Sequence, residues 1–209
     1  MFSIIQAAGW PIWPLLVCSI LALALIIEHF IRLKTVKIAP PTLLAEALSI
    51  SRKGIPDASV IERLSQHSAL GEVLASGFSA LNSKPNCSED DLRASMESTG
   101  RLVAHRMERY MGALATITSA APLMGLFGTV IGMIEIFGSQ SPGSGGANPV
   151  QLAHGISMAL YNTAFGLIVA IPSLIFWRYF RARIDGYVLT LELASESLLR
   201  HLQSLRDES

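Results

Sequence analysis

The sequence has little charge, and long stretches of it hold no basic residue. Charged side chains make up 15% of its 209 residues, whereas a typical soluble domain has about 25%. No Lys or Arg occurs in 1–31 or 110–177, and Glu135 is the one carboxylate between Arg109 and Arg178. The mean hydropathy is +0.45. These deficits argue against a water-soluble monomer.

The sequence also lacks the motifs of common catalytic and metal sites. It contains no Gly-rich phosphate loop, no HExxH motif and no paired cysteines. Cys18 lies in an apolar stretch and Cys87 in a polar one, so we expect no disulfide. Sixteen basic and sixteen acidic residues are intermixed, which argues against nucleic acid as a partner. We therefore expect a non-enzymatic protein without a metal or cofactor.

Three apolar segments are each long enough to cross a membrane, because about 20 helical residues span the ~30 Å hydrocarbon core. These predicted spans are 12–31, 111–137 and 150–177. Basic residues flank them on one side only, at positions 32, 34 and 37, 106 and 109, and 178, 181 and 183. Cytoplasmic flanks are the ones enriched in Lys and Arg.

The charge bias therefore predicts the topology. The N-terminal segment 1–11 and the Gly-, Ser- and Pro-rich loop 138–149 are expected outside. A helical region, 32–110, and a C-terminal helix, 178–209, are expected in the cytoplasm.

Both cytoplasmic regions have helical patterns. Shorter helices are predicted over 41–53, 56–66 and 68–81. From Ser88, an N-cap followed by acidic residues opens a helix that no signal stops before the second span. If continuous, this helix would run from 88 to 137, and half of it would project into the cytoplasm. After the third span, apolar spacing of four and three residues indicates a packing seam, formed by Ile184, Val188, Leu191, Ser195, Leu198, Leu202 and Leu205.

Small and hydroxyl-bearing residues are frequent in the second and third spans. Gly128 and Gly132 form a GxxxG pattern, which favours close helix packing, and Gly166 with Ala170 repeats the spacing. Thr129 and Thr163 are expected at similar depth on antiparallel helices. Each hydroxyl either bonds back to its own helix, as a buried Thr commonly does, or serves a function.

Three further residues have two open interpretations. Pro122 and Pro172 each remove a helical hydrogen bond inside the membrane, giving either a packing kink or a hydrated opening. Glu135 is a functional candidate because a carboxylate inside a membrane is costly. It lies within a turn of the outer loop, however, and could instead reach the interface.

Two stretches of these spans resemble the MotA/TolQ/ExbB proton-channel family, most closely its ExbB branch. Residues 121–133, APLMGLFGTVIGM, resemble the family signature APLLGLLGTVxGM. Residues 155–172, GISMALYNTAFGLIVAIP, resemble the second signature, GIxEALxxTAxGLxxAIP. The match covers about 110–180 by motif and the whole chain by layout.

The resemblance implies an all-α membrane protein with three transmembrane helices and long cytoplasmic helical extensions, assembled as a homopentamer in the bacterial inner membrane. It also implies an ExbD-like single-span partner, dimeric in the pore, that carries the proton-binding Asp. Thr129 and Thr163 match the two pore-facing threonine positions, and Glu135 is a candidate polar residue at the pore mouth. The expected helix-packing glycines are Gly125, Gly128, Gly132 and Gly166.

The implied function is a channel and motor subunit, driven by the proton-motive force, that energises TonB-dependent outer-membrane uptake of the iron-siderophore type. One departure from the second signature is Met158, which stands where many members have Glu. This substitution argues against proton transfer through that side chain. The alternatives are a TolQ-like subunit of the Tol-Pal envelope system and a stand-alone transporter of small solutes.

Overall fold

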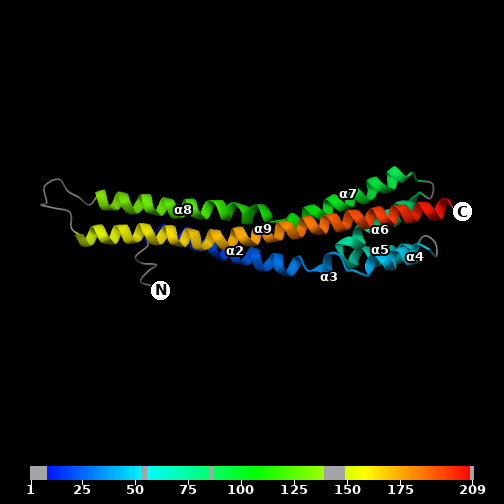
Figure 1. Ribbon diagram of the computed structural model, residues 1–209, viewed down its shortest axis with the longest axis horizontal. Coiled ribbons are helices and arrows are strands. Elements are labelled where there is room, and N and C mark those ends of the chain that lie inside the picture. Colours follow the sequence, from blue (N-terminus) through cyan, green and yellow to red (C-terminus); the bar gives the residue numbers. More distant parts are fainter. Residues whose placement is uncertain (1–8, 53–55, 85–86, 139–148, 208–209) are drawn as a thin grey trace. The chain divides into compact units, whose positions relative to one another are not determined.

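The computed structural model describes residues 9–52, 56–84, 87–138 and 149–207, and these form helices with no strand among them (Figure 1). In chain order the helices are α2 (Ile12–Arg32), α3 (Thr35–Ile38), α4 (Leu43–Ser51), α5 (Ala58–His67), α6 (Ala69–Ser83), α7 (Glu89–Glu108), α8 (Met111–Gly138) and α9 (Pro149–Asp207). The prediction of an all-α chain is confirmed.

The chain divides into two compact units, each built from separate stretches of sequence. The apolar unit comprises the described residues of 1–28 and 110–179, and the polar unit comprises those of 29–109 and 180–209. Helices α2 and α9 contribute to both units. Three helical stretches are long and apolar enough to cross a membrane, within Ile12–Arg32, Glu89–Gly138 and Leu152–Ser204.

The apolar unit exposes much of its hydrophobic surface. On α2, Ile20 and Leu23 are 68% and 60% exposed, and on α8 Leu123 is 64% exposed. Such a surface is costly in water but matches a lipid environment. The indole ring of Trp10 packs edge-on against Phe127 of α8, with ring centroids 6.1 Å apart.

The helix that opens after Ser88 is not continuous to 137, because α7 ends at Glu108 and α8 begins at Met111. Between them Tyr110 has a φ of 68°, in the left-handed region that costs an L-residue about 1–2 kcal/mol. Neither Pro nor Gly occurs from His105 to Met111, so no sequence signal marks the break. It coincides with the boundary between the units, which falls between Arg109 and Tyr110.

Large side chains form the core of the polar unit. Phe78, Met96, Phe180 and Leu198 are each at most 1% exposed. The predicted seam on α9 contributes to this core through the buried Ile184, Leu191, Leu198 and Leu202, whereas the side chain of Leu205 lies outside the described residues. Helix α6 packs against both α5 and α7.

Two helices of the polar unit begin at well-formed caps. Ser88 accepts a hydrogen bond from the backbone N–H of Asp91 at 3.1 Å, and the Asp91 side chain accepts one from the N–H of Ser88, which completes a capping box. Ser68 similarly accepts from the N–H of Gly71 at 3.0 Å and begins α6. The N-cap predicted at Ser88 is therefore confirmed.

Polar side chains join α9 to the rest of the polar unit. The Tyr187 hydroxyl donates to the carbonyl of Leu33 at 3.0 Å and lies 3.0 Å from the hydroxyl of Thr35. Arg183 donates to both of these hydroxyls. This cluster fixes the segment that follows α2 against α9.

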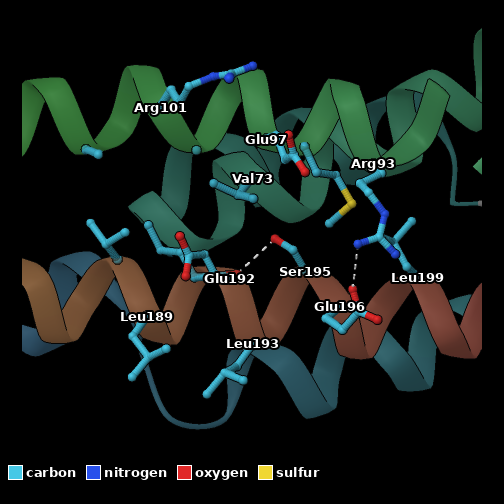
Figure 2. A pocket seen from close by; sticks show the side chains of 15 residues that line it. Val73, Arg93, Glu97, Arg101, Leu189, Glu192, Leu193, Ser195, Glu196 and Leu199 are labelled. Carbon is cyan, nitrogen blue, oxygen red and sulfur yellow. Dashed lines mark hydrogen bonds and ion pairs between the residues drawn. The ribbon is translucent and has the colours of Figure 1, made fainter. Parts of the chain in front are cut away.

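A cavity of about 530 Å³ lies between α7 and α9 in the polar unit (Figure 2). At one end of it Arg93 forms an ion pair with Glu196 at 3.2 Å, which Figure 2 marks with a dashed line. The hydrogen bond that Arg93 donates to Glu89, followed by the charge of Glu196, raises the pKa of Arg93 above its ordinary value. This exposed guanidinium therefore keeps its charge at any physiological pH.

Candidate functional site

The candidate site is the contact between α8 and the first part of α9, which run side by side in the apolar unit (Figure 1). Their backbones touch at two glycines. A Cβ atom on Gly125 would lie 2.9 Å from the carbonyl oxygen of Asn162, and one on Gly166 would lie 2.7 Å from that of Ala121. Real Cβ atoms essentially never come within 3.0 Å of such atoms. Any larger residue at either position would therefore push the helices apart.

Two more glycines of α8 continue this close contact. A Cβ atom on Gly128 would lie 2.5 Å from the Cβ of Asn162, and one on Gly132 would lie 3.1 Å from the carbonyl oxygen of Gly155. Gly125, Gly128 and Gly132 are all buried. The four glycines singled out in the sequence thus lie in one helix contact, as small residues do where helices meet in lipid.

Thr163 lies inside this contact. It is half-buried, and its Cα would be 3.1 Å from a Cβ on Gly125. Its hydroxyl donates across the interface to the carbonyl of Gly125, at a long 3.5 Å. The hydroxyl therefore reaches the neighbouring helix instead of bonding back to its own. A bond of that length is weak and leaves the group able to take another partner.

Thr129 has a different environment. Its hydroxyl donates to the carbonyl of Leu126 at 2.6 Å, which is the local bond of a Thr in a helix. It borders an open cavity of about 510 Å³ whose other lining residues are Val130, Met133, Ile134, Phe137 and Gly138. Thr129 lies one turn, or about 6 Å, along α8 from Gly125. The two threonines are therefore close in depth but bond to different carbonyls.

Asn162 is a polar residue of the site that the sequence reasoning missed. It is fully buried, and its amide nitrogen donates to the carbonyl of Met158 at 3.1 Å. Its side chain fills the space that Gly128 leaves open. The available signal was an amide residue directly before Thr163, in a stretch without Lys or Arg.

The remaining candidates lie around this contact. Met158 is 5% exposed, and its sulfur would be 3.0 Å from a Cβ on Gly9, so it is packed inside the apolar unit. Glu135 is exposed on α8, one turn before the helix ends at Gly138. No group of His, Cys, Asp or Glu among the described residues could hold a metal ion.

Both candidate prolines lie inside helices, Pro122 in α8 and Pro172 in α9. Neither can donate to the carbonyl four residues earlier. Next to Pro172, the buried Ser173 donates its hydroxyl to the carbonyl of Val169 at 2.7 Å. The buried Ser173 hydroxyl thus has a hydrogen-bond partner in its own helix.

The sequence profile of the MotA/TolQ/ExbB proton channel family matches residues 65–193, which include the whole of the α8–α9 contact. The chain belongs to this family. Its members are membrane proteins, and with three apolar helical stretches the chain is a multi-pass membrane protein. The family assignment expected from the two motifs is confirmed.

Individual relatives place the chain near the ExbB branch of the family. It is 33% identical to the biopolymer transport protein ExbB-like 3 of Synechocystis sp. over 178 residues, covering 85% of this chain and 83% of the relative. It is 28% identical to the biopolymer transport protein exbB1 of Vibrio cholerae, covering 80% and 73%. The Tol-Pal system protein TolQ of Pseudomonas aeruginosa is 35% identical over 52% of this chain and 48% of its own.

Proposed function

We propose that this chain is the channel subunit of a motor driven by the proton-motive force, with Thr163 and Thr129 bordering the proton path. The observation that carries the proposal is the Thr163 hydroxyl, which lies in a glycine contact between two membrane helices and is held by one long bond to Gly125. A hydroxyl can both donate and accept a hydrogen bond, so it can orient water or a partner's carboxyl group.

The titrating group of this path belongs to another chain. Residues 110–177 hold no Lys or Arg and one carboxylate, Glu135, which is exposed near the end of α8. Met158 is buried and apolar, so it relays no proton. An ExbD-like single-span partner, dimeric within a homopentamer of this chain, supplies the proton-binding Asp.

Proton flow then performs work on a TonB-like protein, and the uptake it energises is of the iron-siderophore type. Each proton that crosses the membrane releases about 2.3 kcal/mol per 100 mV. We place the subunit in the bacterial inner membrane with its N-terminus in the periplasm and its C-terminus in the cytoplasm. The basic flanks of the three spans support this orientation.

The test is Thr163→Val, which keeps the shape of the side chain and removes the hydroxyl. We expect siderophore uptake to fall at least tenfold in cells that depend on this protein, with the mass of the detergent-solubilised assembly unchanged. The matched control is Thr116→Val, since Thr116 is exposed on α8 and its hydroxyl bonds back to Gly112 at 2.9 Å. Normal uptake by the Thr163 variant would remove Thr163 from the path.

A TolQ-like role in the Tol-Pal system is the second candidate, favoured by the similarity to a TolQ over half of the chain. Co-purification separates the two. A tagged chain that retains ExbD and TonB supports the uptake function, whereas one that retains TolR instead supports the envelope function.

A further inference from the structure

The polar unit contains a second pocket, of about 560 Å³, that the proton path does not use. Three separate stretches line it: the end of α2 with the residues after it, the junction of α5 and α6, and the end of α7. Its ionisable side chains are His29, Arg32, Lys37, His67, Glu72 and Arg106. A volume in the range of about 300–1,000 Å³ is typical of small-molecule sites.

The charge of this pocket is strongly positive. Arg32, Lys37 and Arg106 supply three full positive charges, and Glu72 supplies the one carboxylate. That carboxylate forms an ion pair with Arg106. The lining therefore has more basic than acidic side chains, which favours an anionic occupant.

The start of α6 adds to this preference. Ser68, the N-cap, and Ala69, the first residue of this 15-residue helix, both line the pocket. The N-terminus of a helix carries a partial positive charge and offers backbone N–H groups to anions. Guanidinium and ammonium groups that line one pocket with a helix N-terminus are a combination suited to phosphate.

The place of the pocket in the chain points to a lipid. Arg32 is the last residue of α2, which crosses the membrane, and Arg106 precedes the start of α8 by five residues. Both residues are therefore expected near the membrane surface, where the chain leaves the hydrocarbon core. Directly before Arg32, Phe30 and Ile31 are 46% and 51% exposed, which provides apolar surface for acyl chains.

We propose that this pocket binds the phosphate of an anionic phospholipid headgroup, with Arg32 and Lys37 as its principal ligands. The buried apolar residues Leu33, Ile38 and Val103 also line the pocket. A bound lipid would join the end of α2 to α3 through one phosphate. The proposal requires membrane insertion of the chain and does not depend on the identity of the partner proteins.

The experiment is a lipid titration of the purified full-length chain, followed by native mass spectrometry. Phosphatidylglycerol is compared with zwitterionic phosphatidylcholine for the wild type and for the double variant Arg32→Gln/Lys37→Gln. We expect the wild type to prefer phosphatidylglycerol and the variant to bind it about 30-fold more weakly, the factor that two basic residues provide at an anionic surface. Phosphatidylcholine binding should not change.

The matched control is Arg52→Gln/Arg200→Gln, which removes two exposed charges of the polar unit outside the pocket. An equal loss in this control would show general charge attraction and overturn the site. The charge-preserving exchange Arg32→Lys/Lys37→Arg should retain binding, and its failure to do so would also overturn the proposal. Displacement of the lipid by millimolar inorganic phosphate would assign the pocket to a free anion instead.

Discussion

The two units hold their helices together in opposite ways. In the apolar unit α8 and α9 meet where side chains are missing, with Gly125 against Gly166. In the polar unit the helices meet through large side chains such as Phe180 and Leu198. Lipid gives apolar helices no hydrophobic reason to associate, so contact there depends on close backbone approach. In water, by contrast, burial of large side chains drives packing.

The two units also differ in whether their polar side chains bond within one helix or between helices. Hydroxyl groups of the apolar unit, such as those of Thr129 and Ser173, donate to nearby carbonyls of their own helices. In the polar unit, ion pairs cross between helices, as Arg181 does with Glu108 at 2.8 Å. Water competes for exposed charges, so such a pair contributes about 0–1 kcal/mol. The Thr163 bond is notable because it crosses helices inside the apolar unit.

The largest expected effect of a substitution is in the polar unit. Phe180 is 1% exposed and contacts the rings of His29 and Phe30, with centroids 5.2 and 5.0 Å away. Phe180→Ala should lower the free energy of unfolding of this unit by about 3–5 kcal/mol. Hydrogen exchange of its slowest amides measures this. Val36→Ala, at a 75% exposed position, should change it by less than about 0.5 kcal/mol.

In the apolar unit we expect a larger side chain at a glycine of the helix contact to be destabilising. Gly166→Ala places a Cβ against backbone atoms of α8 and should cost about 1–3 kcal/mol, seen as a lower midpoint of thermal unfolding in detergent. Gly112→Ala is the control, because nothing lies within 4 Å of a Cβ there. It should be neutral or stabilising by up to about 1 kcal/mol. Equal effects at both glycines would refute the backbone contact.

A smaller effect is expected at the start of α7. Ser88→Ala removes the cap of this helix and should destabilise the polar unit by about 1 kcal/mol, measured by amide exchange in the first turns of α7. In Ser83→Ala the lost hydroxyl only donates to the carbonyl of Ser79, so we expect a change within about 0.5 kcal/mol. If the two variants behave alike, the capping box does not stabilise α7.

The sequence predicts those features of the fold that depend on amino-acid composition and on the spacing of apolar residues along a helix. The spans follow from apolar length, and the α7 cap from Ser88 and the acids behind it. The break at Tyr110 could not be predicted, because it arises where two separately packed units join. Within the site, the glycines were predictable from their spacing. Asn162 was not, since its burial depends on the space that Gly128 leaves on the facing helix.

The interruption at Tyr110 also affects how the chain is made. Synthesis proceeds from the N-terminus, so α7 is complete before the apolar residues of α8 follow. Helical hydrogen bonds join residues four apart, so each helix can form its backbone hydrogen bonds separately. Helix α7 can form them in water, and α8 can form them on entering lipid. A helix continuous through residue 110 would link these two events in one cooperative transition. We therefore expect the break at the left-handed Tyr110 to separate the folding of α7 from the membrane insertion of α8.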